Sequence, residues 1–404
     1  MITEATEEFL AHLADRFADP TPSLITPAQC IDTGAAGIAL FHAVRARHDP
    51  ISAERAHAWV RAATADGVDA SQRAGAFYGL PALSLLLSLF PDQYTHARAT
   101  LTRHLNTLAH RRLDAAQARR ERQEPLTFAE YDAITGLTGI GAVLLRTDPH
   151  GTAMAGILDY LVRLTEPVRV HGEELPGWWV QHDPWHNAVP AWEGGHANLG
   201  TAHGVGGVLA LLALAHRQGV RVPHQDEAID RVCSYLDAWR RQDEDGAWWP
   251  GWTTPRRSGG KGMEVGKPGG MSWCYGTPGL ARAQQLAGLA LGDMARCALA
   301  ERAMAGCLEP SSLDRVDGTG LCHGLAGVVQ AAYRMAQDQD RSTRAPDLNT
   351  GLTEATQRLF RRTLSGDTAL TGLLEGPLGA VMALSTVTGG SSGPSWDACV
   401  LLTA

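Results

Sequence analysis

The sequence predicts an all-α protein whose helices form an inner and an outer ring, and three observations support this. A short glycine unit, G-x-x-G, recurs along the whole chain, and an apolar run of helical length follows each copy. These runs are apolar nearly all round, as in VGGVLALLALAH, which is typical of buried helices. The segments between them are amphipathic and rich in arginine, as in DEAIDRVCSYLDAWRRQ, which suits helices that face water.

The glycine unit occurs seven times, at irregular spacings of 45 to 72 residues. Glycine permits a positive φ and a close approach of the backbone, so each unit is expected to be a tight turn that leads into a helix. The second unit has Ala82 after Gly79, whereas the other six have glycine in both places. Those six are Gly34–Gly37, Gly136–Gly139, Gly204–Gly207, Gly276–Gly279, Gly324–Gly327 and Gly376–Gly379.

Repeats that bury their faces against neighbours can stack as an open solenoid or close on themselves. The periodicity does not choose between the two, and we favour closure. Strand signals are sparse. The segment 168–180 indicates a small hairpin, so that a hairpin and loop insertion is expected around 165–196 of a chain that otherwise forms one domain, 1–404.

The composition limits the classes of function. Of 404 residues, 44% are hydrophobic and 19% are charged, as in a globular protein. The net charge of −8 argues against nucleic-acid binding, which needs a basic face. The N-terminus is acidic where a secretory signal would be basic, and the longest apolar stretch, 79–90, is too short to span a bilayer. We therefore expect a cytoplasmic protein with no membrane span and no nucleic-acid partner.

Two of the seven cysteines, Cys274 and Cys322, lie among glycines, in SWCYGTPG and GLCHGLAG. The odd number of cysteines argues against a disulfide framework. Together with His323, these two thiols form a set that suits zinc and leaves a fourth position open for water or substrate. Taken alone, however, the three residues are better explained as two buried thiols and a hydrogen-bonded histidine.

Reactive residues are found in four consecutive turns. They are Asp132, His203, Cys274 and the pair Cys322–His323. If the inner helices all point the same way, their turns gather at one end of the ring. Residues that are far apart in the sequence are then expected to meet in one pocket.

The motifs NLGTAHGVGG, SWCYGTPG and LCHGLAG, in this order and within these repeats, resemble the lanthionine synthetase C family. The resemblance covers essentially the whole chain. It implies an α/α toroid with seven inner and seven outer helices, glycine-rich turns at one end and a zinc ion at that end. The ligands that it implies are Cys274, Cys322 and His323.

The resemblance also implies catalytic roles for His203, Asp132 and Tyr275. His203 would transfer protons, and Asp132 would orient or tune that imidazole. From the residues alone, His203 could equally cap a helix and Asp132 could be an N-cap. The chain departs from the family pattern at Gly270, where members usually carry an arginine. Three cations lie nearby as candidate substitutes, namely Arg256, Arg257 and Lys267.

The activity implied is that of a free-standing class I lanthipeptide cyclase. Such an enzyme adds cysteine thiols to dehydroalanine or dehydrobutyrine and forms (methyl)lanthionine rings. The partners implied are a dehydrated precursor peptide, with leader and core, a lanthipeptide dehydratase and a peptide exporter. One alternative is a non-cyclising or glutathione-handling zinc protein of the same family. Another is a helical-toroid glycosidase that uses Asp132 and Glu375 as its two carboxylates.

Two further features stay open. Nine of the eleven tryptophans lie between residues 178 and 273, and they either pack long connections or form a groove for a peptide. Three histidines, His182, His186 and His196, are better explained as polar loop residues than as a second metal site, because they lack tight ligand spacing.

Overall fold

A computed structural model of the chain describes most of its residues. The described segments are 2–21, 27–47, 49–170, 173–183, 194–244, 246–255, 263–265, 270–339, 345–365, 372–389 and 395–404.

Seven helices form an inner ring, and each begins directly after the first glycine of a G-x-x-G unit or of its variant at Gly79. They are buried nearly all round, as the sequence predicts. In α10 every residue from Val205 to His216 is buried. The inner helices are α3 (Ala35–Arg45), α5 (Leu80–Ser88), α8 (Leu137–Thr147), α10 (Val205–Arg217), α12 (Thr277–Leu291), α15 (Leu325–Asp338) and α17 (Pro377–Gly389).

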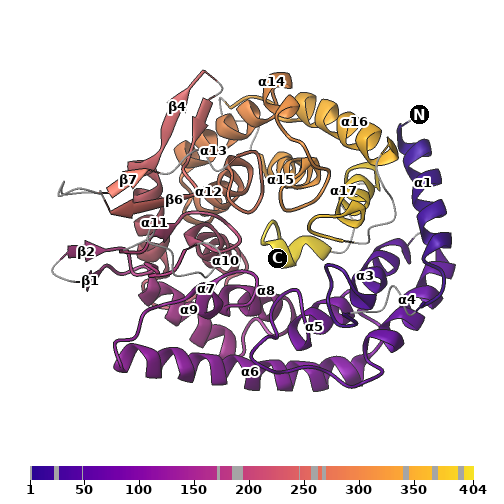
Figure 1. Ribbon diagram of the computed structural model, residues 1–404, viewed down its shortest axis with the longest axis horizontal. Coiled ribbons are helices and arrows are strands. Elements are labelled where there is room, and N and C mark those ends of the chain that lie inside the picture. Colours follow the sequence, from indigo (N-terminus) through magenta and orange to yellow (C-terminus); the bar gives the residue numbers. More distant parts are fainter. Residues whose placement is uncertain are drawn as a thin grey trace.

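Seven longer or more polar helices surround them, and Figure 1 shows the two rings in one view. The chain alternates between the rings, so the expected all-α toroid of seven inner and seven outer helices is confirmed within the described residues. The outer helices are α1 (Ile2–Arg16), α4 (Pro50–Ala63), α6 (Thr95–Glu121), α9 (Thr152–Leu164), α11 (Gln225–Trp239), α13 (Met294–Cys307) and α16 (Asn349–Ser365). Two short helices, α7 (Phe128–Tyr131) and α14 (Pro310–Asp314), lie in the connections.

A closed belt of backbone hydrogen bonds joins the seven turns. Each turn donates one N–H to a carbonyl of the next turn, with N···O distances of 2.7 to 3.1 Å, and the seventh turn donates to the first. The belt therefore closes the structure as a ring, which the repeat pattern alone did not decide. The donors are Ile31, Ala76, Ala133, Thr201, Trp273, Cys322 and Leu373, and the acceptors, in the same order, are Phe77, Ile134, Ala202, Cys274, Cys322, Leu374 and Asp32.

The glycines are needed mainly because the backbone approaches itself closely. A Cβ on Gly279 would lie 2.0 Å from the carbonyl oxygen of Trp273, six residues earlier. The second glycines of the other five G-x-x-G units meet the same obstacle at 2.0 to 2.4 Å. The expectation of a positive φ holds for the first glycine of only one turn, Gly79, whose φ is +71°.

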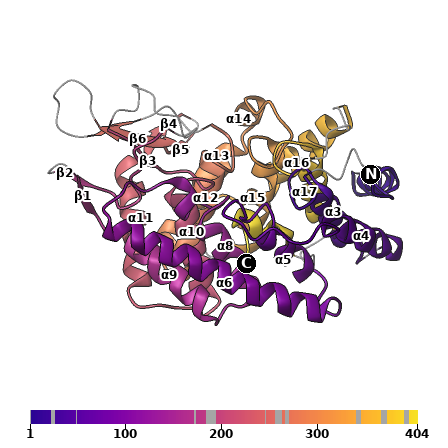
Figure 2. The ribbon, with the colours of Figure 1, turned by 60° about the horizontal axis from the view of Figure 1, so that its bottom comes forward.

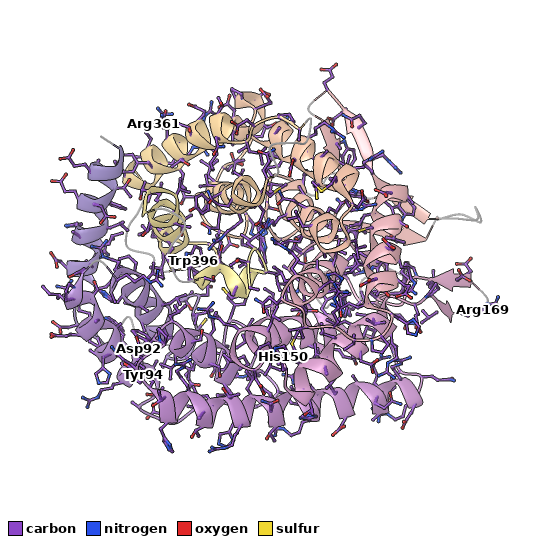
Figure 3. All side chains as sticks on the ribbon, turned by 180° about the vertical axis from the view of Figure 1, so that it is seen from behind. Asp92, Tyr94, His150, Arg169, Arg361 and Trp396 are labelled. Atoms are coloured by element: carbon purple, nitrogen blue, oxygen red, sulfur yellow. The ribbon has the colours of Figure 1, made fainter. Side chains whose placement is uncertain are left out.

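The C-terminal segment lies in the middle of the ring. Its 3₁₀ helix η2 (Trp396–Val400) is drawn in yellow at the centre of Figure 1, and Figure 3 labels Trp396 there. The indole of Trp273 donates to the carbonyl of Val400 at 2.8 Å. Asp397 is fully buried and accepts two hydrogen bonds from Arg334, at 2.7 and 2.8 Å, and one from Gln330.

The variant Asp397→Ala is expected to lower the free energy of unfolding by about 3–5 kcal/mol, because it leaves Arg334 largely buried without its counter-charge. Urea denaturation followed by circular dichroism measures this loss. The matched control is Asp314→Ala, which removes an exposed partner of Arg358 and should cost under about 1 kcal/mol. Equal losses in the two variants would contradict the prediction.

In the described part of the chain, seven short strands stand on one side of the ring, next to α11–α13 (Figures 1 and 2). Two of them form a hairpin in the region where the sequence indicates one. The others, between residues 197 and 265, were not predicted, because they are only two to four residues long. The pairs are β1 (Val168–Val170) with β2 (Glu173–Leu175), β4 (Arg241–Asp243) with β5 (Gly246–Trp248), and β6 (Trp252–Pro255) between β3 (Ala197–Asn198) and β7 (Met263–Val265).

Among the described residues, no helix has the length and apolar character that crossing a membrane requires.

Candidate active site

One position of the repeat carries most of the reactive side chains. It is the residue directly before the first glycine of each turn, here called the pre-glycine position. In turns four to seven this position holds His203, Tyr275, His323 and Glu375. The belt keeps neighbouring turns in nearly the same register, so these side chains meet in pairs. His323 and Glu375 are hydrogen-bonded, and the rings of His203 and Tyr275 have their centroids 6.1 Å apart.

The three residues expected to bind metal come together. One ligand atom from each of Cys274, Cys322 and His323 lies within 4.8 Å of the other two. Ligands of a tetrahedral zinc ion are about 3.5–4 Å apart, given Zn–S and Zn–N distances of roughly 2.3 and 2.0 Å. Both thiols are buried and free, whereas His323 is exposed.

The electrostatics of this cluster call for a cation. The hydrogen bond with Cys322, and then that with His323, lowers the pKa of Cys274 to about 5 against the effect of burial. The same contact with Cys274 raises the pKa of Cys322. The two adjacent thiols therefore oppose each other's ionisation, and a divalent metal ion would relieve this opposition. The donor set thus fits a metal ion.

Glu375 holds the histidine of the cluster. Its Oε1 lies 2.7 Å from Nδ1 of His323, and this contact leaves Nε2 available as a ligand atom. Contacts with Cys274 and then with Glu375 raise the pKa of His323 to about 9. From the sequence alone, Glu375 is expected only as a candidate glycosidase carboxylate. Its pre-glycine position, shared with His323, was the signal for this role.

The candidate proton-transfer residues form a second pair. Oδ2 of the buried Asp132 lies 2.6 Å from Nδ1 of His203. The other oxygen of Asp132, Oδ1, accepts the backbone N–H groups of Ile134, Thr135 and Gly136. Asp132 therefore holds the turn and contacts the histidine at once, but it is not the N-cap of α8, because that position is Gly136.

Two residues of α7 also fix His203. They are not predictable from the repeat pattern, because they lie outside it. The ring of Phe128 stacks on the imidazole, with centroids 5.4 Å apart and planes 22° apart. The hydroxyl of Tyr131 donates to the carbonyl of His203 at 2.9 Å. His203 is thereby held on both its ring and its backbone, while 28% of its side chain stays accessible.

The metal cluster and the His203–Asp132 pair are neighbours, because the turns that carry them are hydrogen-bonded to each other. The amide of Thr201, two residues before His203, donates to the carbonyl of Cys274 at 2.7 Å. Tyr275 lies beside His203, and burial raises the pKa of its hydroxyl.

Gly270 has a φ of +74° and open space where a Cβ would be. Its proposed substitutes, Arg256, Arg257 and Lys267, lie outside the described residues.

Most tryptophans of the described part of the 178–273 region are packed into the interior of the protein. Trp178, Trp249 and Trp273 are almost fully buried, whereas Trp252 makes an edge contact with Tyr275 at 6.5 Å. Trp185 and Trp192 lie outside the described residues.

The histidines of the loop lie beside the proton-transfer pair. His182 and His196 contact the ring of Phe128, with centroids 4.6 and 5.5 Å from it. His186 is outside the described part of the chain, and within that part only the Cys274 cluster groups three metal ligands.

The chain is thus an α/α toroid whose turns carry a Cys₂His cluster beside a His–Asp pair. The family described as Lanthionine synthetase C-like protein matches residues 29–401, and the chain belongs to this family. One relative is the nisin biosynthesis protein NisC of Lactococcus lactis subsp. lactis, 22% identical over 333 residues, which are 80% of this chain and 75% of that protein. A solved structure of a nisin cyclase has the same fold, with a TM-score of 0.77 and 20% identity over 99% of this chain and 97% of that one.

Proposed function

We propose that the protein is a zinc-dependent lanthipeptide cyclase. It would add cysteine thiols to dehydroalanine or dehydrobutyrine within a dehydrated precursor peptide and form thioether rings. The observation that carries this proposal is the placement of a Cys₂His cluster and a His–Asp pair in adjacent turns. Thiol activation and proton transfer are the two tasks that this addition requires.

Cys274, Cys322 and His323 would hold the zinc ion, which when bound would lower the pKa of the substrate thiol and fix its position. His203 is placed to deliver a proton. As the new C–S bond forms at the β-carbon, the electron pair of the double bond moves to the α-carbon and the adjoining carbonyl. The imidazole protonates the α-carbon and recovers the proton that the thiol lost. Asp132 keeps the imidazole oriented for both transfers.

Tyr275 lies beside His203 and is proposed to form part of the same active site. The loss of the family arginine at Gly270 leaves room for another cation, and Arg256, Arg257 or Lys267 remains the proposed source. The partners proposed are a leader-bearing precursor peptide, the dehydratase that prepares it and an exporter for the product, all met in the cytoplasm.

Incubation with a zinc salt, glutathione and a peptide that carries one cysteine and one dehydroalanine tests the proposal. Ring closure should protect the cysteine from alkylation, which mass spectrometry detects. The alternative, glutathione handling, predicts a glutathione adduct of the peptide and an open cysteine instead. The glycosidase alternative is disfavoured because His203 and His323 already engage Asp132 and Glu375.

The variant Glu375→Gln is expected to weaken zinc binding about 10–100-fold, because the His323 ring loses its charged acceptor. Competition with a chromophoric chelator measures the dissociation constant without any peptide. Glu354→Gln is the control, because Glu354 is a carboxylate of the outer helix α16 that pairs with Arg358. An unchanged dissociation constant in Glu375→Gln would show that the hydrogen bond has no role in metal binding.

A further inference from the structure

A cavity lies at the rim of the toroid, outside the cluster and the His–Asp pair. It has a volume of about 610 Å³ and lies between the C-terminal ends of α6 and α9 and the strand β1. Outer helices run opposite to inner ones, so these C-terminal ends lie at the end of the toroid that carries the turns. Figure 3 labels Arg169 of β1 at the outer edge of the molecule, on the right.

Only a short stretch separates the cavity from His203. Leu126 lines the cavity and forms a β-bridge with Val180. Phe128, two residues further on, stacks on the imidazole of His203. A peptide bound in the cavity would therefore be held beside the proposed active site.

The lining of the cavity is positively charged, whereas the chain as a whole is negatively charged. Four arginines line it, against one carboxylate, in a chain of net charge −8. That carboxylate, Glu124, already pairs with Arg122. The four arginines are Arg119, Arg120, Arg163 and Arg169.

Two of these arginines are neutralised within the protein and two are not. Arg119 forms two hydrogen bonds with Glu130, at 2.7 and 3.1 Å, and Arg163 pairs with Asp159. Arg120 and Arg169 are exposed and have no ion pair with another residue of the described segments, although Glu174 lies opposite Arg169 in the β1–β2 pair. Arg120 could serve the C-terminal dipole of α6, but Arg169 belongs to a strand, so that explanation does not apply to it.

Apolar side chains complete the cavity. Leu126, Leu164 and Trp179 are buried along its floor, and Val168 stands 40% exposed at its edge. An apolar floor under two guanidinium groups that form no ion pair within the described residues matches a peptide segment in which acidic and apolar side chains alternate.

We propose that this cavity binds an acidic, partly apolar segment of the peptide substrate, outside the residues that form the rings. This inference rests on the proposed function. A segment held there would keep the remaining cysteines near the site at a high effective concentration while successive rings are closed.

The first test measures binding without catalysis. The probe is a fluorescein-labelled synthetic peptide in which aspartate alternates with leucine, and its twin has asparagine in place of aspartate. By fluorescence anisotropy, the full chain should bind the aspartate peptide about tenfold more tightly than the twin. The double variant Arg120→Ala/Arg169→Ala should abolish this difference.

The control double variant, Arg61→Ala/Arg361→Ala, removes the same charge from the outer helices α4 and α16, on the far side of the ring (Figures 1 and 3). It should keep the preference for aspartate. Equal binding of the two peptides by the unmodified chain, or an equal loss in the control variant, would overturn the proposal. Sedimentation that shows a dimer broken only by Arg120→Ala/Arg169→Ala would place a second copy of the chain in the cavity instead.

A second test links the cavity to the reaction. Each synthetic peptide is joined to a dehydrated segment that carries one cysteine and one dehydroalanine. The aspartate extension should lower KM about tenfold and leave kcat unchanged, and Arg120→Ala/Arg169→Ala should cancel this gain. If neither fusion is cyclised, the proposed function fails and the anisotropy result still decides whether the cavity binds acidic peptides.

Discussion

The variant Cys322→Ala should contain far less than one zinc ion per chain, and its ring closure should fall by about 10³-fold or more. The loss is large because the pKa lowering and the positioning of the substrate thiol would disappear together. The fold should survive, since Cys322 contributes to the belt only through its backbone. Metal analysis, circular dichroism and alkylation followed by mass spectrometry measure the three effects.

Cys233→Ala is the matched control. Cys233 is also buried, and burial raises the pKa of its thiol to about 12, so it is an inert cysteine of the outer helix α11. This variant should keep both zinc and activity. Full zinc in Cys322→Ala would show that the cluster is not the metal site.

The variant His203→Ala should keep its zinc and bind the dehydrated peptide normally, but close rings ~10²–10⁴-fold more slowly. Without the imidazole, water would protonate the α-carbon from either face, so the new stereocentre should become mixed. Mass spectrometry gives the rate, and chiral analysis of the hydrolysed product gives the configuration. The control is His216→Ala. His216 lies in the last turn of α10, the inner helix that follows His203, and this variant should close rings at the normal rate.

Asp132→Asn should show a milder form of the same defect. The amide retains an oxygen to accept the N–H groups of the turn, so the turn should keep its shape while the imidazole loses its anionic partner. A normal rate and a single stereoisomer in His203→Ala would mean that another group, with Tyr275 the nearest candidate, delivers the proton.

The turns and the inner helices could be predicted from the sequence, because they depend on residues that are close together in the chain. The second glycines mark positions that a Cβ cannot occupy, so the turns and the helices behind them could be placed by counting. The close approach of Cys274, Cys322 and His323 followed from the resemblance, because their spacing alone favoured no metal site. Their coordination, however, is still a prediction.

Features that depend on long-range contacts were not predictable in this way. The bond from Leu373 to Asp32, which closes the belt, joins residues from opposite ends of the chain. Glu375 differs from other exposed carboxylates only because the seventh turn lies beside the sixth. Phe128 and Tyr131 reach His203 from a four-residue helix that lies outside the glycine repeat.

The closed belt has a consequence for how the protein is made on the ribosome. A growing chain delivers the seven units one after another, but the seventh must pair with the first before either inner helix is covered on both sides. Until then α3 and α17 each present an apolar side that invites association with other chains. The residues of the proposed active site span Asp132 to Glu375, so no early fragment can hold a partial site in working order. Closure and competence for catalysis should therefore arise in one late, cooperative event after most of the polypeptide has emerged.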